Sequence, residues 1–237
     1  MSFLNKSKHY FKDIFRYPKM KKADDDYDAY WRSRDIEAGL NSFQIKRVIL
    51  LRREIDKNDS ILDVGCGDGR FLDYLKEKSH QGELLGVDSS DYVLEKAKNR
   101  GLVVIKKDIR DVKQLSDLGP PVGGFDVVVL FEVLEHMANA EELLEWAYGH
   151  SKKAVIFSVP NTGFVVHRLR LLFGRFPLQW RVHPSEHLRF WTLGDMKWWL
   201  KSQSYKNFKI RLYEGVPILN RLWPSLFGQG ILVVLRK

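Results

Sequence analysis

Short apolar runs alternate with amphipathic segments through the middle of the 237-residue chain. Uninterrupted apolar runs predict buried strands, and apolar residues that recur every three or four positions predict helices. The predicted strands fall at 61–64, 84–88, 103–107, 125–131 and 154–159, and the predicted helices among them at 69–78, 92–100 and 140–148. Because such alternation is typical of parallel sheets covered on both faces, the pattern predicts an α/β fold with a doubly wound, mostly parallel sheet.

The C-terminal part of the chain departs from this alternation. Segments 208–213 and 231–235 predict an antiparallel strand pair at the edge of the sheet. Residues 160–190 follow the fifth strand and carry five arginines and three histidines, so we interpret them as a lid or substrate-recognition insert that overhangs the strand ends. Apolar residues of a predicted helix in this insert share one face: Val165, Val166, Leu169, Leu172 and Phe173.

An N-terminal helical segment, residues 1–44, precedes the main domain, residues 45–237. Within it, residues 1–22 place aromatic side chains at helical spacing among lysines, which predicts a short basic amphipathic helix. Such a helix either packs on the domain or makes peripheral contact with a membrane, and the sequence leaves both open. Residues 27–36 and 43–55 are predicted to form two further helices.

Charge is distributed unevenly along the chain. The net charge is +6 over residues 1–22, −9 over residues 23–150 and +12 over residues 151–237. Basic ends on an acidic middle indicate an anionic partner, such as a phosphate-bearing substrate, a membrane surface or a nucleic acid, or else only solvated charge. The single cysteine, Cys66, excludes an intrachain disulfide, and no secretory signal is recognised. We therefore expect a cytoplasmic protein.

Three glycines, Gly65, Gly67 and Gly69, follow the first predicted strand. Glycine permits a sharp turn and a close approach of a nucleotide-like ligand to the backbone. Asp88 ends the second strand, where a carboxylate can accept both hydroxyls of a ribose, and Asp108 follows the third, within reach of an adenine amino group. A dinucleotide-binding dehydrogenase would share the first features, but its usual spacing is G-x-G-x-x-G and here it is G-x-G-x-G.

A cluster of chemically useful side chains follows the strand at 125–131. Glu132, Glu135 and His136 stand at positions i, i+3 and i+4, so a helical turn would place them on one face. Two carboxylates and an imidazole can bind a divalent cation, with a further ligand from the insert. Without a metal, His136 can act as a general base, and the turn can also simply line a pocket or cap a helix.

Several of these motifs, taken in order, resemble the successive motifs of class I S-adenosylmethionine-dependent methyltransferases: Asp63-Val-Gly-Cys-Gly-Asp-Gly69, Gly86-Val-Asp88, Asp108 and Phe125 to His136. The resemblance covers roughly residues 45–160 and implies a Rossmann-like fold with S-adenosylmethionine as the methyl donor. By this resemblance the cofactor-binding residues are Asp63, Gly65, Cys66, Gly67, Gly69, Asp88, Ser89, Asp108, Ile109 and Phe131.

The turn Glu132-x-x-Glu135-His136 is similar to the metal-binding turn of ubiquinone-type O-methyltransferases. Small-RNA 2′-O-methyltransferases have the same turn and add a histidine from a downstream segment. The resemblance therefore implies Mg²⁺ or Mn²⁺ held by Glu132, Glu135, His136 and His187. With Ser158-Val-Pro-Asn161 and the run at 184–191, the chain most resembles the MetW-like and ubiquinone-type branch.

We expect O-methylation of a small-molecule or lipid-linked acceptor, with His136 and Glu132 as the catalytic residues and an anionic acceptor favoured by the arginines of the insert. Two alternatives stay open. An RNA methyltransferase would use the basic C-terminal third and four tryptophans as stacking surfaces, namely Trp180, Trp191, Trp198 and Trp199. A MetW-like accessory subunit would bind the cofactor without turnover and associate with an acyltransferase.

Overall fold

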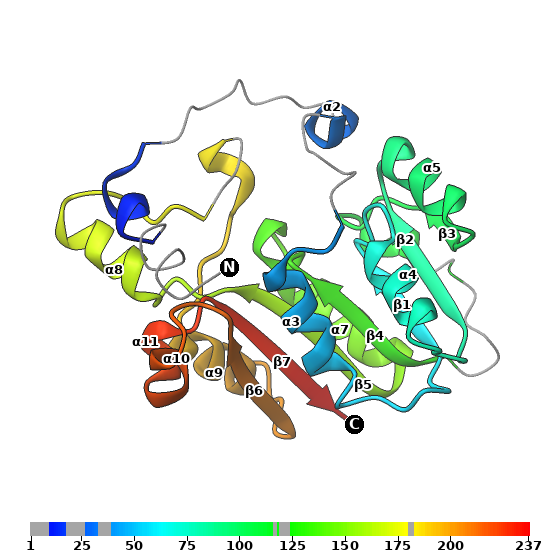
Figure 1. Ribbon diagram of the computed structural model, residues 1–237. Helices are drawn as coiled ribbons and strands as arrows, with labels where there is room; N and C mark the ends of the chain where they lie inside the picture. The colour runs from blue at the N-terminus through cyan, green and yellow to red at the C-terminus, as the bar shows by residue number, and fades with distance from the viewer. Residues whose placement is uncertain (1–9, 18–26, 33–38, 116–117, 119–123, 180–182) are drawn as a thin grey trace.

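A seven-stranded sheet forms the centre of the computed structural model (Figure 1), which describes residues 10–17, 27–32, 39–115, 118, 124–179 and 183–237. The strands are β1 Ile61–Val64, β2 Leu84–Asp88, β3 Val103–Lys106, β4 Phe125–Phe131, β5 Ser151–Pro160, β6 Phe208–Tyr213 and β7 Gly230–Arg236. Their order is β3-β2-β1-β4-β5-β7-β6, with β1 to β5 parallel and β7 antiparallel to both of its neighbours. The predicted doubly wound sheet and its antiparallel C-terminal pair are confirmed.

Helices cover both faces of this sheet. Their bounds are α2 Tyr27–Arg32, α3 Ser42–Leu51, α4 Arg70–Glu77, α5 Asp91–Asn99, α6 Val112–Leu115, α7 Ala140–His150, α8 Val165–Leu172, α9 Leu193–Ser202, α10 Leu219–Leu222 and α11 Pro224–Phe227. Two short 3₁₀ helices, η1 Leu134–His136 and η2 Pro184–Glu186, lie in connections. Residues 10–15 are also helical. The helix predicted at 43–55 ends earlier, at Leu51, where a turn follows.

Alternate side chains of the central strands enter two separate cores. In β4, Val128 and Leu130 pack in the core beneath α7 and α9, whereas Val127 and Val129 pack in the core beneath α3, α4 and α5. This explains why the central strands read as continuous apolar runs, because both of their faces are covered.

The order of the strands reverses between β1 and β4. After β1 the chain adds β2 and β3 on one side, and it then crosses to the other side for β4 and β5. In open α/β sheets the loops at the carboxyl ends of the strands part at such a point, and ligands bind there. The glycine loop after β1 and the acidic turn after β4 therefore lie side by side at this position.

The insert at 160–190 leaves the sheet and returns to nearly the same point. Asn161 and Trp191 form an isolated parallel bridge, so the two ends of the insert are held together. The apolar face that we predicted for its helix is only partly correct. Val166 is buried, but Leu172 is 75% exposed and Phe173 is also exposed.

Arg170 takes a buried position of α8 because it binds backbone carbonyls at the end of the N-terminal helix. Its guanidinium donates to the carbonyl oxygens of Asp13, Ile14 (3.2 Å) and Arg16 (2.9 Å). Ile14 packs beside Phe164 in a small third core. The helix at residues 10–15 thus packs on the domain. Residues 1–9 and 18–22 of the predicted basic segment lie outside the described residues. No helix within the described ranges is long and apolar enough to cross a membrane.

Candidate active site

The loop after β1 requires its three glycines. Gly65, Gly67 and Gly69 have φ values of 81°, 55° and 74°, a left-handed conformation that residues with a β-carbon rarely adopt. A β-carbon at Gly65 would lie 2.6 Å from Cγ2 of Val133, and one at Gly67 would lie 3.2 Å from the indole of Trp31. The loop is therefore enclosed by the turn after β4 on one side and by α2 on another.

Asp88 joins the end of β2 to this loop. Its carboxylate accepts from the backbone N–H of Gly67 (2.9 Å) and from that of Ser90 (3.1 Å). The residue is 2% exposed, and burial raises the pKa of its carboxyl. Each carboxylate oxygen has more than one lone pair, so the group can also accept from a ligand hydroxyl. Ser89, half-buried, lies between these contacts.

The short helix α2 lies across the start of α5 and reaches the loop. Asp28 accepts hydrogen bonds from the Ser90 hydroxyl and the Tyr92 backbone N–H, and the bond from Ser90 lowers the pKa of Asp28. Trp31, on the same helix, lies over Gly67. The sequence predicts a helix here, but nothing in its pattern of residues indicates that it packs against the site.

Two further predicted cofactor residues, Asp108 and Ile109, follow the end of β3. Asp108 forms an ion pair with Arg110 (2.8 Å), whose hydrogen bonds lower the pKa of Asp108. A ligand amino group would therefore share this carboxylate with Arg110. Ile109 lies 3.5 Å from the position of a β-carbon on Gly65.

Cys66 fills space behind the loop. Its Sγ would lie 2.7 Å from a β-carbon at Gly86, which explains why β2 has a glycine at that position. Burial raises the pKa of the Cys66 thiol well above its ordinary value, so the side chain is a packed, protonated thiol and no nucleophile. Its contribution to the site comes from its backbone and its volume.

Arg47 is a buried cation between the two loops that the sequence analysis did not single out. Its Nη1 lies 3.2 Å from Ser158 Oγ and 3.3 Å from Glu132 Oε1, and the guanidinium stacks 4.5 Å above the ring of Phe131. Burial raises the pKa of Asp63 to about 7, and the charge of Arg47 opposes that shift. Phe43, Arg47 and Leu51 recur at every fourth position, which could have indicated that the arginine shares the buried face of α3.

Glu132 points toward Arg47 and away from the rest of its motif. It has a φ of 56°, and its side chain accepts a 2.7 Å hydrogen bond from Ser158. The expectation that one helical turn places Glu132, Glu135 and His136 on one face is wrong. The 3₁₀ turn begins only at Leu134, and the left-handed residue before it redirects the chain.

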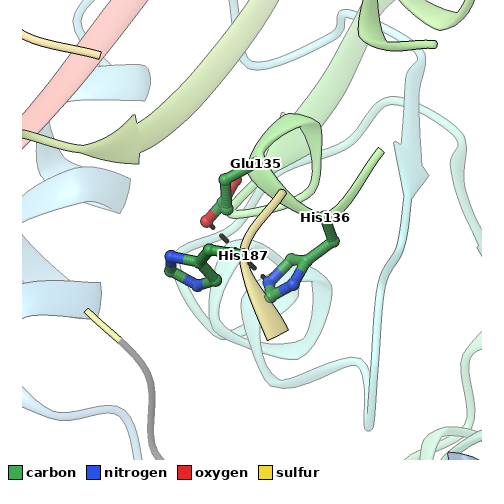
Figure 2. A group of neighbouring side chains, drawn as sticks. All are labelled: Glu135, His136 and His187. Carbon is green, nitrogen blue, oxygen red and sulfur yellow. Dashed lines mark ion pairs between the residues drawn. The ribbon is translucent and has the colours of Figure 1, made fainter. Parts of the chain in front are cut away.

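Glu135, His136 and His187 come together from two segments that lie about fifty residues apart in the chain (Figure 2). One ligand atom from each of the three lies within 4.8 Å of the others. His136 Nε2 is 4.0 Å from Glu135 Oε1, and the two imidazole rings meet edge to face with their centroids 4.6 Å apart. Three of the four residues predicted to hold a metal are thus adjacent, and Glu132 is not among them.

Glu135 is the unusual member of this cluster. It is 1% exposed, and neither carboxylate oxygen has a hydrogen-bond partner among the described residues. Burial, and secondarily the charge of Glu132, raise its pKa well above the ordinary value. A buried carboxyl without donors needs either a proton or a cation to offset its lost hydration.

Backbone contacts orient His136 and hold the segment that carries His187. Nδ1 of His136 lies within hydrogen-bond distance of the Glu186 carbonyl, and a proton on Nδ1 directs the Nε2 lone pair toward Glu135. The backbone N–H groups of Leu188 and Arg189 both donate to the Glu135 carbonyl, at 2.8 and 3.1 Å. The residue that supplies the carboxylate therefore also holds the segment that supplies His187.

The tryptophans considered as stacking surfaces have different positions. Trp191 and Trp199 are buried in the core beneath α9, and Trp199 donates to the Glu141 carboxylate (2.7 Å). Trp180 lies outside the described residues. Trp198 is 70% exposed. Two of the four side chains are therefore core residues that cannot stack on a base.

A mostly parallel sheet of this strand order with an antiparallel β7, and with a glycine loop and a carboxylate at its switch point, is typical of the class I S-adenosylmethionine-dependent methyltransferases. The chain belongs to the family described as "Methyltransferase domain", whose profile matches residues 31–210. Its family and fold are those of the S-adenosylmethionine-dependent methyltransferases.

Individual relatives are distant. The chain is 28% identical over 175 residues to the mitochondrial ubiquinone biosynthesis O-methyltransferase of Candida albicans, a match that covers 69% of this chain and 53% of that protein. It is 28% identical over 163 residues to the bifunctional methionine biosynthesis protein MetXA/MetW of Rhodopirellula baltica, covering 60% and 24%. A solved methyltransferase from Archaeoglobus fulgidus has a TM-score of 0.54 at 22% identity, covering 80% and 92%. The chain thus spans about half or less of these two sequence relatives.

Proposed function

We propose that this enzyme transfers the methyl group of S-adenosylmethionine to a hydroxyl oxygen of a small-molecule or lipid-linked acceptor. The observation that carries the proposal is the buried carboxylate of Glu135, without a hydrogen-bond donor among the described residues, beside His136 and His187. One carboxylate and two imidazoles suit Mn²⁺ better than Mg²⁺, which prefers oxygen ligands, and they leave open positions for an acceptor. When bound, such an ion lowers the pKa of a coordinated hydroxyl.

The cofactor residues would hold the donor in place. Asp88 would accept the ribose hydroxyls, the loop from Gly65 to Gly69 would meet the methionine end, and Asp108 would contact the adenine amine. The lone pair of the acceptor oxygen forms the new bond to the methyl carbon, while the carbon–sulfur bond breaks and its electrons return to sulfur. Positioning supplies much of the rate, because the sulfonium is already activated.

The acceptor hydroxyl must lose its proton during this transfer. The imidazole of His136 is the nearest suitable base if no ion is bound. Glu132, predicted as a catalytic residue, would act from a distance, since it pairs with Arg47 and its charge raises the pKa of Glu135. It is therefore a positioning residue in this proposal.

An anionic acceptor is supported mainly by the net charge of +12 in residues 151–237. Individual arginines of the insert give less support. Arg170 is buried against backbone carbonyls, and Arg168 donates to the carbonyl of Gly163 (2.7 Å). We therefore assign the preference to the overall field of this region and not to one arginine.

Calorimetric titration of S-adenosylmethionine and of Mn²⁺ tests the proposal, with Glu135→Gln and His187→Ala as variants. We expect each variant to weaken Mn²⁺ binding at least about tenfold and to retain the donor. Glu142→Gln, an exposed acid on α7, is the control and should change neither. Donor binding without any Mn²⁺ binding would refute the metal site. A methyl-transfer assay on hydroxyl and amine acceptors then decides between oxygen and nitrogen, and binding without transfer would favour an accessory subunit.

A further inference from the structure

Large apolar side chains are exposed on α8, on the turn after it and on the neighbouring N-terminal helix. In Figure 1 the helix at residues 10–15 lies beside α8 at one end of the molecule, and the contacts of Arg170 join the two. We call this surface the α8 face. It is formed by Phe11, Tyr17, Leu171, Leu172, Phe173 and Phe176, all of them more than half exposed. Exposed apolar side chains gathered in this way mark an interaction site.

Contacts between the N-terminal helix and the end of α8 hold the side chains of the α8 face in place. Arg175 donates to the carbonyl of Phe15 (2.9 Å), and its guanidinium lies over the rings of Phe15 (5.6 Å) and Tyr17 (4.7 Å). Phe15 in turn packs against Phe173, with ring centroids 5.2 Å apart. These contacts hold side chains from two segments in one arrangement while leaving them open to solvent.

The charge around this surface selects its partner. Residues 10–17 and 164–178 carry five basic side chains against one acid, Asp13. Arg170 is buried, whereas Lys12, Arg16 and Arg168 are exposed, and Arg16 pairs with Asp13 (2.9 Å). A second copy of the chain would bring like charges together, which disfavours self-association. RNA could contact the cations through its phosphates, but the aliphatic Leu171 and Leu172 neither bind phosphates nor stack on bases. An anionic lipid surface satisfies both the apolar and the cationic groups.

We propose that the α8 face docks on anionic lipid bilayers, with its leucine and phenylalanine side chains at the level of the headgroups and the first acyl carbons. Its composition matches that of helices that lie in a membrane interface, where apolar side chains enter the bilayer and lysine and arginine contact lipid phosphates.

The α8 face also continues toward the candidate active site. The rings of Phe176 and Phe190 meet edge to face with centroids 5.6 Å apart, and Phe190 lies 6.4 Å from the imidazole of His187. A series of ring contacts therefore joins the docking surface to His187, which lies beside Glu135 and His136. This step rests on the proposed methyl transfer: a lipid-linked acceptor would pass from the bilayer along these rings to the site.

Vesicle flotation with the full chain tests the docking separately from the chemistry. Vesicles of phosphatidylcholine with about a third phosphatidylglycerol should bind the protein at least about tenfold more strongly than phosphatidylcholine alone. Leu172→Glu should reduce that binding at least about tenfold, and Lys12→Gln about fivefold. Val103→Glu is the matched control, because Val103 is also highly exposed (66%) but lies on β3 at the opposite edge of the sheet, and it should bind as the wild type does.

The outcomes are distinct. Equal binding to both kinds of vesicle, or equal loss in Leu172→Glu and Val103→Glu, would overturn the proposal. So would a dimer that Leu172→Glu separates in light scattering, or RNA binding that depends on Leu172. Titration of S-adenosylmethionine into Leu172→Glu should give the wild-type affinity, which shows that the variant is folded. Failure of flotation with intact donor binding refutes only the docking, and failure of Mn²⁺ binding with intact flotation refutes only the metal site.

Discussion

Gly65 and Val133 approach each other so closely that a single added methyl group would not fit between them. A β-carbon on Gly65 would lie 2.6 Å from Cγ2 of Val133, well inside van der Waals contact. Gly65 belongs to the loop expected to hold the methyl donor, and Val133 immediately precedes the turn that carries Glu135 and His136. The donor loop and the acceptor cluster are therefore packed against each other as one unit, which fixes the distance between them.

Gly65→Ala should weaken binding of S-adenosylmethionine at least about tenfold. The left-handed φ of 81° costs alanine about 1–2 kcal/mol, and the contact with Val133 adds to this cost. The double variant Gly65→Ala/Val133→Ala should recover part of the affinity, because the clash is removed while the backbone strain stays. Isothermal calorimetry measures both effects.

The control for this pair is Gly149→Ala, because Gly149 lies in α7 with nothing within 4 Å of its added β-carbon. Its donor affinity should stay unchanged, and its stability should rise by at most about 1 kcal/mol. Wild-type affinity in Gly65→Ala would contradict the close packing of the two loops.

Arg47→Met should destabilise the protein by about 3 kcal/mol, since removal of one partner leaves Glu132 and the buried Asp63 without their cation. Arg47→Met/Glu132→Gln should be more stable than Arg47→Met alone, because the unpaired charge is then removed as well. Urea unfolding gives both free energies, with Glu132→Gln completing the double-mutant cycle. Two losses that simply add would show that the pair is not coupled.

Much of the framework follows from local sequence. All seven strands were predicted. Strands of a sheet that is covered on both faces are short continuous apolar runs, and such runs between polar turns are easy to recognise in the sequence. The left-handed glycines of the donor loop could likewise be inferred, since Gly65, Gly67 and Gly69 stand directly after a strand. The grouping of Glu135 with His136 was predicted from their spacing, whereas the approach of His187 to them was predicted through resemblance and not through geometry.

What the sequence did not reveal depends on contacts between distant segments. Arg47 lies on an apolar helix face, and only the fold shows that its guanidinium pairs with Glu132 and donates to Ser158. The direction of the Glu132 side chain was predicted wrongly, because the residue has a left-handed φ and contacts Arg47 and Ser158. These contacts come from other parts of the chain, so the spacing within the motif does not indicate them. In α8 the buried position belongs to Arg170 and Leu172 is exposed, because Arg170 donates to carbonyls at the end of the N-terminal helix.

The stability of the protein should depend on pH through Asp63. Burial raises its folded pKa to about 7 from the ordinary 3.8, with the charge of Arg47 opposing this shift and that of Asp88 adding to it. Between these values the folded state keeps a proton that the unfolded state releases, so this residue's stabilisation is lost as pH rises toward 7, by up to about 1.4 kcal/mol per pH unit. Asp63→Asn should therefore flatten the decline of the unfolding free energy between about pH 4 and pH 7, the interval between the unfolded and folded pKa values. Parallel curves for the two proteins would contradict this assignment.

Arg170→Gln should release the N-terminal helix while leaving the donor site intact. The guanidinium donates to three carbonyls, at Asp13, Ile14 and Arg16, and a charged donor to a buried carbonyl contributes about 1.5–3 kcal/mol. Its loss should raise amide hydrogen exchange in residues 10–15 at least about tenfold, with unchanged affinity for S-adenosylmethionine. Arg221→Gln, an exposed arginine of α10, should leave exchange in that helix as it is. Because the α8 face needs this helix beside α8, the release should also weaken anionic-vesicle binding. Unchanged protection in Arg170→Gln would show that the apolar contacts of Ile14 hold the helix without the arginine.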